Sequence, residues 1–203
     1  MIDKKFGLMA MLFATCFVVA NILAFKLVSV FGFVFPSAVF AFLLAFSITD
    51  IVTEVWGGKA ARSLIVGGFV ANLLAIFLIQ FAIVLPPGGG WGFQDEFGLV
   101  MGSVPRITFA GMVTFVVSKN LNIYVFEKIR KKTGVKHLWL RNNGSSFVAQ
   151  FVDTAMFQAL AFLGVIPVEI LLPMMFTSFC VKMFLDLLKT PLVYLGVWYC
   201  KAK

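Results

Sequence analysis

The sequence predicts an all-α integral membrane protein: a six transmembrane helix bundle with both termini cytoplasmic. Of its 203 residues, 61% are hydrophobic and 13% are charged, whereas soluble domains are roughly 45–50% apolar and about 25% charged. The apolar residues form runs long enough to cross a bilayer. The basic residues gather in alternate gaps between these runs. Together, these observations indicate that lipid surrounds most of the chain.

Six apolar runs account for the expected helices. A span takes roughly 20 residues at a rise of about 1.5 Å per residue. The expected helices cover residues of about 6–30, 33–55, 63–85, 104–129, 145–166 and 170–199. We expect one transmembrane domain over residues 1–203, with a tilt or kink at Pro191 in the last helix.

The first run follows Lys4 and Lys5, as in a secretory signal peptide. It continues to about Val30, whereas the apolar region of a signal peptide is about 7–15 residues long. We therefore interpret it as the first membrane helix.

The basic residues orient the bundle. With the N-terminus in the cytoplasm, the inner segments hold twelve lysines and arginines and the outer segments hold only Arg106. This distribution follows the positive-inside rule. It also argues against nucleic-acid binding, despite a net charge of +8. The glycine-rich outer connection, residues 86–97, is expected to be a flexible loop or a lid.

With the thirteen flanking bases set aside, four lysines remain inside the expected helices, and four acidic residues stand against them. The eight are Lys26, Lys119, Lys182, Lys189, Asp50, Glu54, Asp153 and Asp186. A charge that faces lipid costs several kcal/mol, so these should face one another or a wet cavity. Ion pairing for helix assembly is the structural alternative. Glu54, near the inner end of its helix, also fits an interfacial anchor.

Helical spacing groups the polar residues by face. Asp50 and Glu54 are four residues apart. The fifth helix carries Gln150, Asp153 and Phe157, and the sixth carries a charge network of Lys182, Asp186 and Lys189. Asn21 lies on the first helix, and Asn122 follows Lys119 on the fourth. Polar residues on every helix predict a solvated or ligand-filled centre, although Phe157 equally fits a core residue.

Catalytic chemistry finds no support in the sequence. His137 is the only histidine, and the three cysteines lie in apolar context. Neither a zinc cluster nor a disulfide framework is therefore expected. Gly57-Gly58-Lys59 lacks the other residues of a phosphate-binding loop. We expect no enzyme activity, no cofactor and no metal.

Four segments carry a family resemblance. Thr49-Asp50-Ile-Val-Thr-Glu54-Val-Trp-Gly57, with Lys59 and Arg62, is similar to a motif of the queuosine precursor transporters, once called vitamin uptake transporters. Asn21-Ile-Leu-Ala-Phe-Lys26 resembles their first-helix motif. The other two segments resemble their fifth-helix and sixth-helix motifs: Leu138-Trp139-Leu-Arg141 with Ser145, Ser146, Gln150, Asp153 and Thr154, and Lys182 with Asp186, Thr190, Pro191 and Tyr194.

The resemblance implies a bacterial inner-membrane importer of 7-deazaguanine bases (preQ0, preQ1 or queuine), working by secondary or facilitative transport. One segment departs: Ser118-Lys119-Asn-Leu-Asn122 stands where the family has Ser-Gln-x-x-Asp. The local charge is more positive by two, which should disfavour a ligand with a cationic amine arm.

The expected substrate site combines the resemblance with the spacing. A carboxylate can accept two adjacent N–H donors of a guanine-like edge, and Asp153 with Gln150 is the first choice for this contact. Asp50 and Glu54 would complete the site or carry coupling protons, and Phe157 would stack on the ring. The full expected set is Asp153, Gln150, Asp50, Glu54, Asn21, Lys26, Lys119, Asn122 and Phe157.

The expected partners are the nucleobase and the lipid bilayer, and a homo-oligomer is compatible with the sequence. The alternative function is a substrate-capture subunit of an energy-coupling-factor transporter, which requires a partner ATPase. Ala10 and Ala14 would then suit helix packing against that partner.

Overall fold

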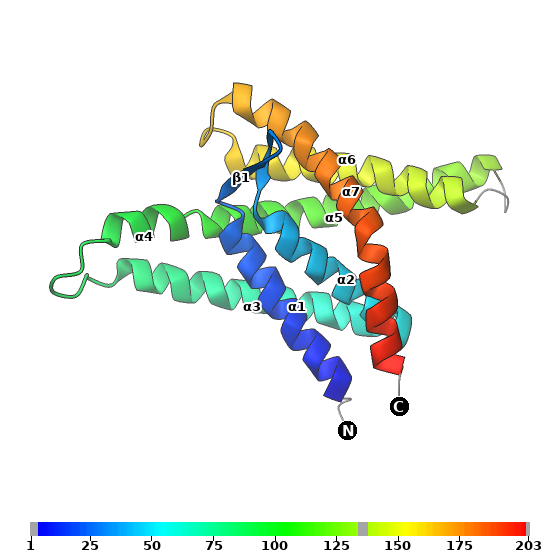
Figure 1. Cartoon of the computed structure of the whole chain (residues 1–203), viewed down its shortest axis with the longest axis horizontal. Helices are drawn as coiled ribbons and strands as arrows, with labels where there is room; N and C mark the ends of the chain where they lie inside the picture. The colour runs from blue at the N-terminus through cyan, green and yellow to red at the C-terminus, as the bar shows by residue number, and fades with distance from the viewer. Residues whose placement is uncertain (1–3, 134–137, 202–203) are drawn as a thin grey trace. The chain divides into compact units, whose positions relative to one another are not determined.

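The computed structural model describes residues 4–133 and 138–201, and this part of the chain is mostly helical (Figure 1). In chain order the elements are α1 (Lys4–Leu23), β1 (Leu27–Val30), β2 (Phe33–Pro36), α2 (Ala38–Trp56), α3 (Gly58–Val84), α4 (Gln94–Met101), α5 (Val104–Thr133), α6 (Leu138–Phe162) and α7 (Val168–Lys201). The order agrees with the expected helices, and several bounds differ.

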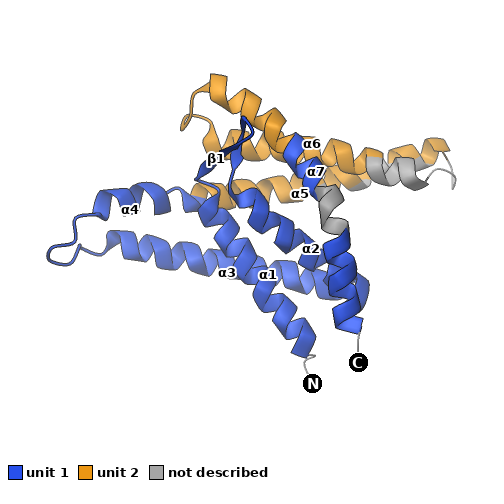
Figure 2. Ribbon diagram, viewed as in Figure 1, with its two compact units in different colours: residues 1–105, 180–203 blue, residues 106–179 orange. Residues whose placement is uncertain are grey.

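The chain divides into two compact units (Figure 2). Unit 1 comprises residues 1–105 and 180–203, and unit 2 comprises residues 106–179. Unit 1 therefore contains α1 to α4, the hairpin and the C-terminal part of α7. Unit 2 contains most of α5, all of α6 and the first part of α7.

Five segments of the described chain are long and apolar enough to cross a membrane: Lys4–Leu23, Ala38–Trp56, Gly58–Val84, Gln94–Asn122 and Val168–Leu185. Many of the large apolar side chains on these segments are exposed. On α3, for example, Phe77 is 65% exposed and Val84 is 82% exposed. Apolar patches of this extent on a helix suit contact with lipid rather than with water.

A β-hairpin corrects the first two expected helices. We expected helix over 6–30 and 33–55, but α1 ends at Leu23 and the chain then forms an antiparallel pair with Val30 opposite Phe33. Phe31 and Gly32 have φ of 51° and 81°, the left-handed geometry of a tight hairpin turn. The β-branched valines of this segment favour strands. A segment judged only by the length of its apolar run does not reveal this preference.

The junction between α2 and α3 lies at Gly57. Its φ of 85° and ψ of 172° belong to a region that essentially only glycine occupies. The chain turns there in one residue, and α3 begins at Gly58, five residues before the expected start. The expected connection over residues 56–62 is therefore mostly the first turn of α3.

The remaining corrections concern connections. The outer loop expected at 86–97 contains the start of α4, which has Asp95 and Glu96 in its first turn, where they complement the helix dipole. Gln94 Nε2 also donates to the carbonyl of Ile83 at 2.9 Å, which ties α4 to the end of α3. Helix α6 begins at Leu138 rather than 145 and ends at Phe162 rather than 166, before Gly164 at φ 81°.

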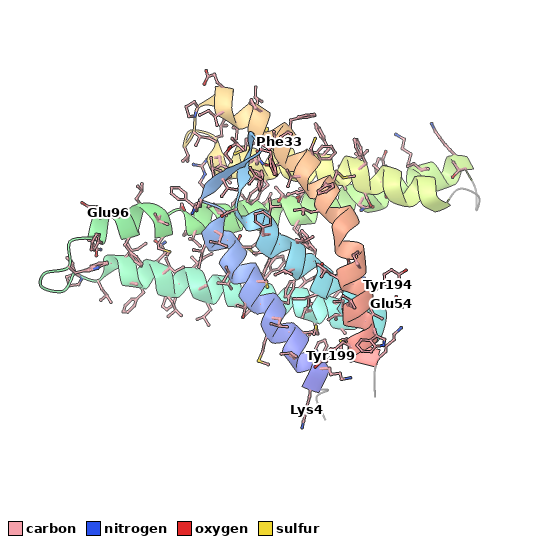
Figure 3. The ribbon with its side chains drawn as sticks, viewed as in Figure 1. Lys4, Phe33, Glu54, Glu96, Tyr194 and Tyr199 are labelled. Carbon is pink, nitrogen blue, oxygen red and sulfur yellow. The ribbon has the colours of Figure 1, made fainter. Side chains whose placement is uncertain are left out.

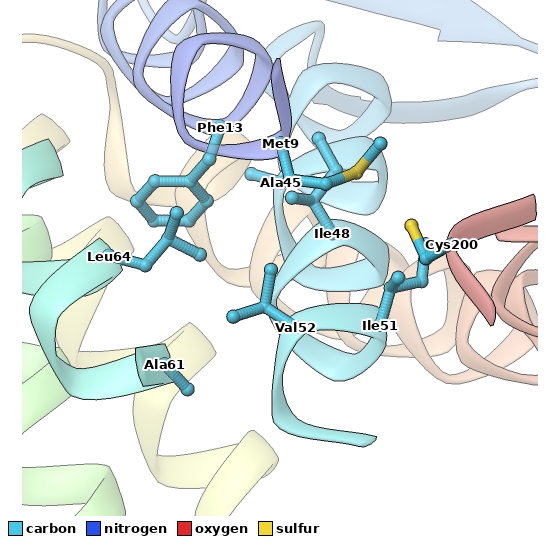
Figure 4. Close-up of a cluster of buried hydrophobic side chains, with 9 residues drawn as sticks. All are labelled: Met9, Phe13, Ala45, Ile48, Ile51, Val52, Ala61, Leu64 and Cys200. Atoms are coloured by element: carbon cyan, nitrogen blue, oxygen red, sulfur yellow. The ribbon is translucent and has the colours of Figure 1, made fainter. Parts of the chain in front are cut away.

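A hydrophobic cluster holds unit 1 together (Figure 4). Phe13 of α1, Val52 of α2 and Leu64 of α3 are each at most 4% exposed. Gly68 allows α1 to approach α3 closely, because a Cβ there would lie 2.5 Å from Cε1 of Phe13. Cys200, near the end of α7, belongs to the same cluster.

The first turn of α1 and the last turn of α7 meet at one end of unit 1. Lys5 Nζ donates to the carbonyl oxygens of Tyr199 at 3.0 Å and Cys200 at 3.4 Å. Lys201 Nζ lies 3.4 Å from Glu54 Oε1, near the end of α2. Figure 3 labels Lys4, Glu54 and Tyr199 at this end. The two ends of the described chain are therefore on one side of the unit.

Candidate functional site

Helix α6 carries a polar face in unit 2. Gln150, Thr154 and Gln158 are spaced by four residues, so they lie on one side of the helix. Thr154 and Gln158 are each 1% exposed. Asp153 and Gln150 are half-buried.

Large apolar side chains on α6 are exposed nonetheless. Phe147 and Phe151 are 51% and 55% exposed, and both meet Phe179 of α7 edge to face. They precede Gln150 and Thr154 by three residues. A helix that buries several polar side chains and exposes large apolar ones is the reverse of a helix in a water-soluble protein. Phe157 is 9% exposed and meets Phe162 edge to face, which agrees with its alternative interpretation as a core residue.

Ser118 of α5 connects to the Asp153 carboxylate. Ser118 Oγ lies 3.3 Å from Oδ1 of Asp153 and at the same distance from the carbonyl oxygen of Phe115. The single hydroxyl proton is shared between these acceptors. A carboxylate has about four acceptor positions and is therefore a group that N–H donors of a ligand can approach.

Three buried polar atoms in unit 2 have no hydrogen-bond partner within the described ranges: Thr108 Oγ1, Gln158 Oε1 and Ser178 Oγ. The amide nitrogen of Gln158 donates to the carbonyl of Met174 at 3.5 Å, so its oxygen faces elsewhere. An unsatisfied buried polar group costs about 1–3 kcal/mol, which a bound water or ligand can offset. The sequence analysis missed these residues. Gln158 was detectable, because it continues the four-residue spacing of Gln150.

Asn21, expected to contact substrate, forms an interhelical bridge in unit 1. Its Nδ2 donates to the carbonyl of Phe17 at 3.0 Å and to Oδ1 of Asn72 on α3 at 2.6 Å. Asn72 in turn donates to the carbonyl of Gly68 at 3.0 Å. Both asparagines are 2% exposed. Both N–H groups of the Asn21 amide are thus used inside the protein.

The two carboxylates of α2 lie on its exposed side. Asp50 and Glu54 are exposed, whereas Ile51 and Val52 between them are buried. The Glu54–Lys201 pair is itself open, with side chains 64% and 55% exposed respectively. This geometry agrees with the interpretation of Glu54 as an anchor at the membrane surface.

Lys26 does not lie within a helix as expected. It is exposed in the turn between α1 and β1, and its backbone closes the base of the hairpin: its N–H donates to the Leu23 carbonyl at 3.1 Å, and its carbonyl accepts from Ser37 N–H at 2.8 Å. The shorter α1 explains the difference, because the helix ends at Leu23, three residues before Lys26.

The other expected site residues are placed only in part. Asn122 of α5 and Lys182 of α7 are half-buried, in units 2 and 1 respectively. The side chains of Lys119, Asp186 and Lys189 lie outside the described residues, so the charge network of α7 stays a prediction. What the structure brings together is Asp153 with Ser118, and Asn21 with Asn72.

Arg106, the one basic residue of the outer segments, has a structural role. Its Nε donates to the carbonyl of Leu160 at 2.8 Å and one terminal nitrogen donates to the carbonyl of Leu163 at 2.5 Å. These carbonyls belong to the end of α6, which leaves its last carbonyls without partners in the helix. A cation is favoured there by the helix dipole.

Comparisons with known proteins extend the motif resemblance. A model of the family described as "Putative vitamin uptake transporter" matches residues 36–196. A "Probable queuosine precursor transporter" of Bacillus subtilis (strain 168) is 31% identical over 196 residues, which cover 94% of this chain and 85% of the relative. No solved structure matches the chain.

These matches confirm the family inferred from the four motifs. The family is one of transporters rather than enzymes. With several helices suited to crossing a bilayer, the protein is a multi-pass membrane protein. The chain belongs to the vitamin uptake transporter family and is related to the Bacillus subtilis protein named as a probable queuosine precursor transporter.

Proposed function

We propose that this chain imports queuosine precursors, the 7-deazaguanine bases, across the bacterial inner membrane by secondary or facilitated transport. The observation that carries the proposal is the half-buried Asp153 carboxylate, which Ser118 contacts on the polar face of α6. The name of the Bacillus subtilis relative supplies the substrate class.

The chemistry of the ligand suits this carboxylate. A guanine-like ring presents two N–H donors side by side, and one carboxylate accepts both. The Ser118 contact limits the rotation of Asp153. Gln150, one turn before Asp153, and the unsatisfied oxygen of Gln158, five residues beyond Asp153 and on another side of the helix, provide further polar groups on α6. Asp50 and Glu54 remain candidates for coupling protons.

Six crossings fit the placement of the chain ends. Lys5 contacts the Tyr199 carbonyl, so the first and last helices end on one side of unit 1. A chain with both ends on one side crosses an even number of times, whereas five segments qualify by length and composition. Helix α6 supports a sixth crossing, because its 25 residues extend about 37 Å and several of its large apolar side chains, Phe147 and Phe151 among them, are exposed. The basic residues favour the cytoplasm for both ends.

Uptake by the purified chain tests the function. Reconstituted alone in liposomes, it should accumulate or equilibrate radiolabelled preQ0, preQ1 or queuine, while adenine enters at the rate of empty liposomes. Equilibrium binding of the same bases to the detergent-solubilised protein should accompany the uptake. Binding without uptake would instead support a substrate-capture subunit that requires an ATPase partner. Neither binding nor uptake of any deazaguanine would reject the proposal.

A further inference from the structure

A groove runs between α1 and α3 on the surface of unit 1. It encloses about 310 Å³ and is lined by Phe6, Ala10 and Ala14 of α1 and by Ser63 and Gly67 of α3, among others. Apart from Ser63 these side chains are apolar. Both helices qualify as membrane spans, so the groove lies at the depth of the lipid acyl chains.

The two helices run in the same direction along the groove. Phe6 and Ser63 line it together near the helix starts, and further along Asn21 bonds to Asn72. The N-termini of α1 and α3 are therefore at the same end. In the proposed topology this end is cytoplasmic.

Three exposed bases gather at that end, and Glu54, an acidic residue at the same end, is paired with Lys201. Lys4 in the first turn of α1, and Lys59 and Arg62 in the first turn or so of α3, are exposed. Lys59 precedes Ser63 by four residues, which places it on the groove side of α3. Neither helix contains an acidic residue.

Basic residues at the start of an α-helix run against the direction of the helix dipole. The N-terminus of a helix already carries a partial positive charge, so lysine there is unfavourable. Two such N-termini and three exposed bases create a site for an anion, because free backbone N–H groups and cations both attract a phosphate. An apolar groove that begins at an anion site matches a molecule with an anionic head and a hydrocarbon tail.

We infer that the α1–α3 groove binds an anionic diacyl phospholipid of the cytoplasmic leaflet, with its phosphate at Lys4 and Lys59 and one acyl chain in the groove. A second copy of the chain fits less well. A two-fold dimer through this face would place the two basic ends against each other at the same depth, and like charges there repel.

Native mass spectrometry of the delipidated full-length protein tests the inference. Phosphatidylglycerol and phosphatidylcholine with the same acyl chains are added back in turn. We expect the phosphatidylglycerol adduct to be several-fold more abundant. In the variant Lys4→Gln with Lys59→Gln, phosphatidylglycerol should bind roughly fivefold more weakly per lysine removed, since one base near anionic lipid contributes about 1 kcal/mol.

A groove-filling variant tests the acyl chain separately. Gly67→Leu has open space for the new side chain, so the protein should fold and the adduct should be lost. Matched controls are Ala82→Leu, exposed further along α3, and Lys131→Gln with Lys132→Gln, exposed on α5. Both should leave the adduct unchanged. Thermal unfolding of every variant verifies that it is folded.

Several outcomes would overturn the inference. Equal binding of the two lipids would remove the head-group preference. Equal binding of soluble glycerol phosphate would leave a phosphate site without a lipid groove. A dimer that Gly67→Leu dissociates would assign the groove to a second copy. An adduct that survives both variants would place the lipid elsewhere.

Discussion

At the scale of single residues, the polar side chains of this protein take two different roles, which their hydrogen bonds distinguish. Asn21 and Asn72 satisfy each other and the helix carbonyls, so they hold two helices together. Asp153 contacts Ser118 of a neighbouring helix, and its own helix also carries Gln158, whose buried side-chain oxygen has no hydrogen-bond partner among the described residues. A half-buried carboxylate is suited to a ligand with N–H donors.

Replacement of the Asp153 carboxylate should weaken ligand binding. Asp153→Asn keeps the shape but substitutes a donor for one acceptor oxygen, so a ligand N–H would face another N–H. The cost of about 1–3 kcal/mol corresponds to roughly five- to 150-fold in affinity. Isothermal titration with a deazaguanine measures it.

Asp95→Asn, an exposed carboxylate of α4, is the matched control and should bind as the wild type does. If Asp153 only carries a proton, equilibrium binding will change little at fixed pH while driven uptake fails. Unchanged binding together with unchanged uptake would refute both roles.

The asparagine pair should contribute stability rather than affinity. Asn21→Leu leaves Asn72 Oδ1 buried without its donor. Hydrogen bonds between membrane helices contribute about 0.6 kcal/mol on average and up to roughly 1.7. We expect a loss of this size in the free energy of unfolding, measured by denaturation in mixed micelles.

Adding Asn72→Leu to Asn21→Leu should recover part of the lost free energy of unfolding, because no buried amide then lacks its hydrogen-bond partner. Ligand affinity should stay within about twofold in all three variants, a shift below about 0.5 kcal/mol. A large loss of affinity at unchanged stability would instead make Asn21 a ligand contact.

At the scale of elements, the connections decide how the helices begin and end. The hairpin at 27–36 and the one-residue turn at Gly57 both depend on positive φ, which glycine tolerates and other residues rarely adopt. These turns let α1, α2 and α3 follow one another with little intervening chain. They therefore fix which faces of the three helices form the core of unit 1.

Two adjacent glycines provide a matched test of this junction. Gly57→Ala places a Cβ at φ 85° and ψ 172°, which costs on the order of 1–3 kcal/mol. Gly58→Ala lies within α3, has open space around it, and should be neutral or slightly stabilising. Thermal unfolding of the two variants in the same detergent compares them. Equal melting temperatures would contradict the strained geometry assigned to Gly57.

The sequence predicted a mostly helical membrane protein because apolar runs of span length are long-range signals. It failed over residues 24–36, where the same apolar composition serves helix and strand. It also failed to find Ser178 and Thr108, because a single hydroxyl residue in a membrane helix has no distinguishing pattern and its burial depends on neighbouring helices. Asp153 was singled out because a carboxylate deep in an apolar run is costly, and its role with Gln150 as a substrate contact stays a prediction.

At the scale of the whole molecule, the number of crossings determines on which side each connection lies. In the six-crossing topology, Lys59 is cytoplasmic, and both Asp95 in α4 and Glu169 at the start of α7 are outside. If α6 did not cross, Glu169 would be cytoplasmic as well. All three side chains are exposed, so each can be replaced by a reporter.

Cysteine accessibility in intact cells measures this topology. In a background without Cys16, Cys180 and Cys200, we expect an impermeant thiol reagent added outside to label Asp95→Cys and Glu169→Cys. Lys59→Cys should react only after the membrane is permeabilised. Labelling of Asp95→Cys but not of Glu169→Cys in intact cells would reduce the number of crossings and reject α6 as a span.

The contact of Lys5 with the carbonyls of Tyr199 and Cys200 has a consequence for biogenesis. Unit 1 joins α1, α2 and α3 to the C-terminal part of α7, which is synthesised well after them. Its core, which includes Cys200 and the close approach of Gly196 to Ile51, cannot close until α7 has been made. During translation α1, α2 and α3 therefore remain in the membrane with one flank uncovered. A truncated product would keep that flank open, giving the cell's membrane proteases a surface by which to distinguish unfinished chains from finished ones.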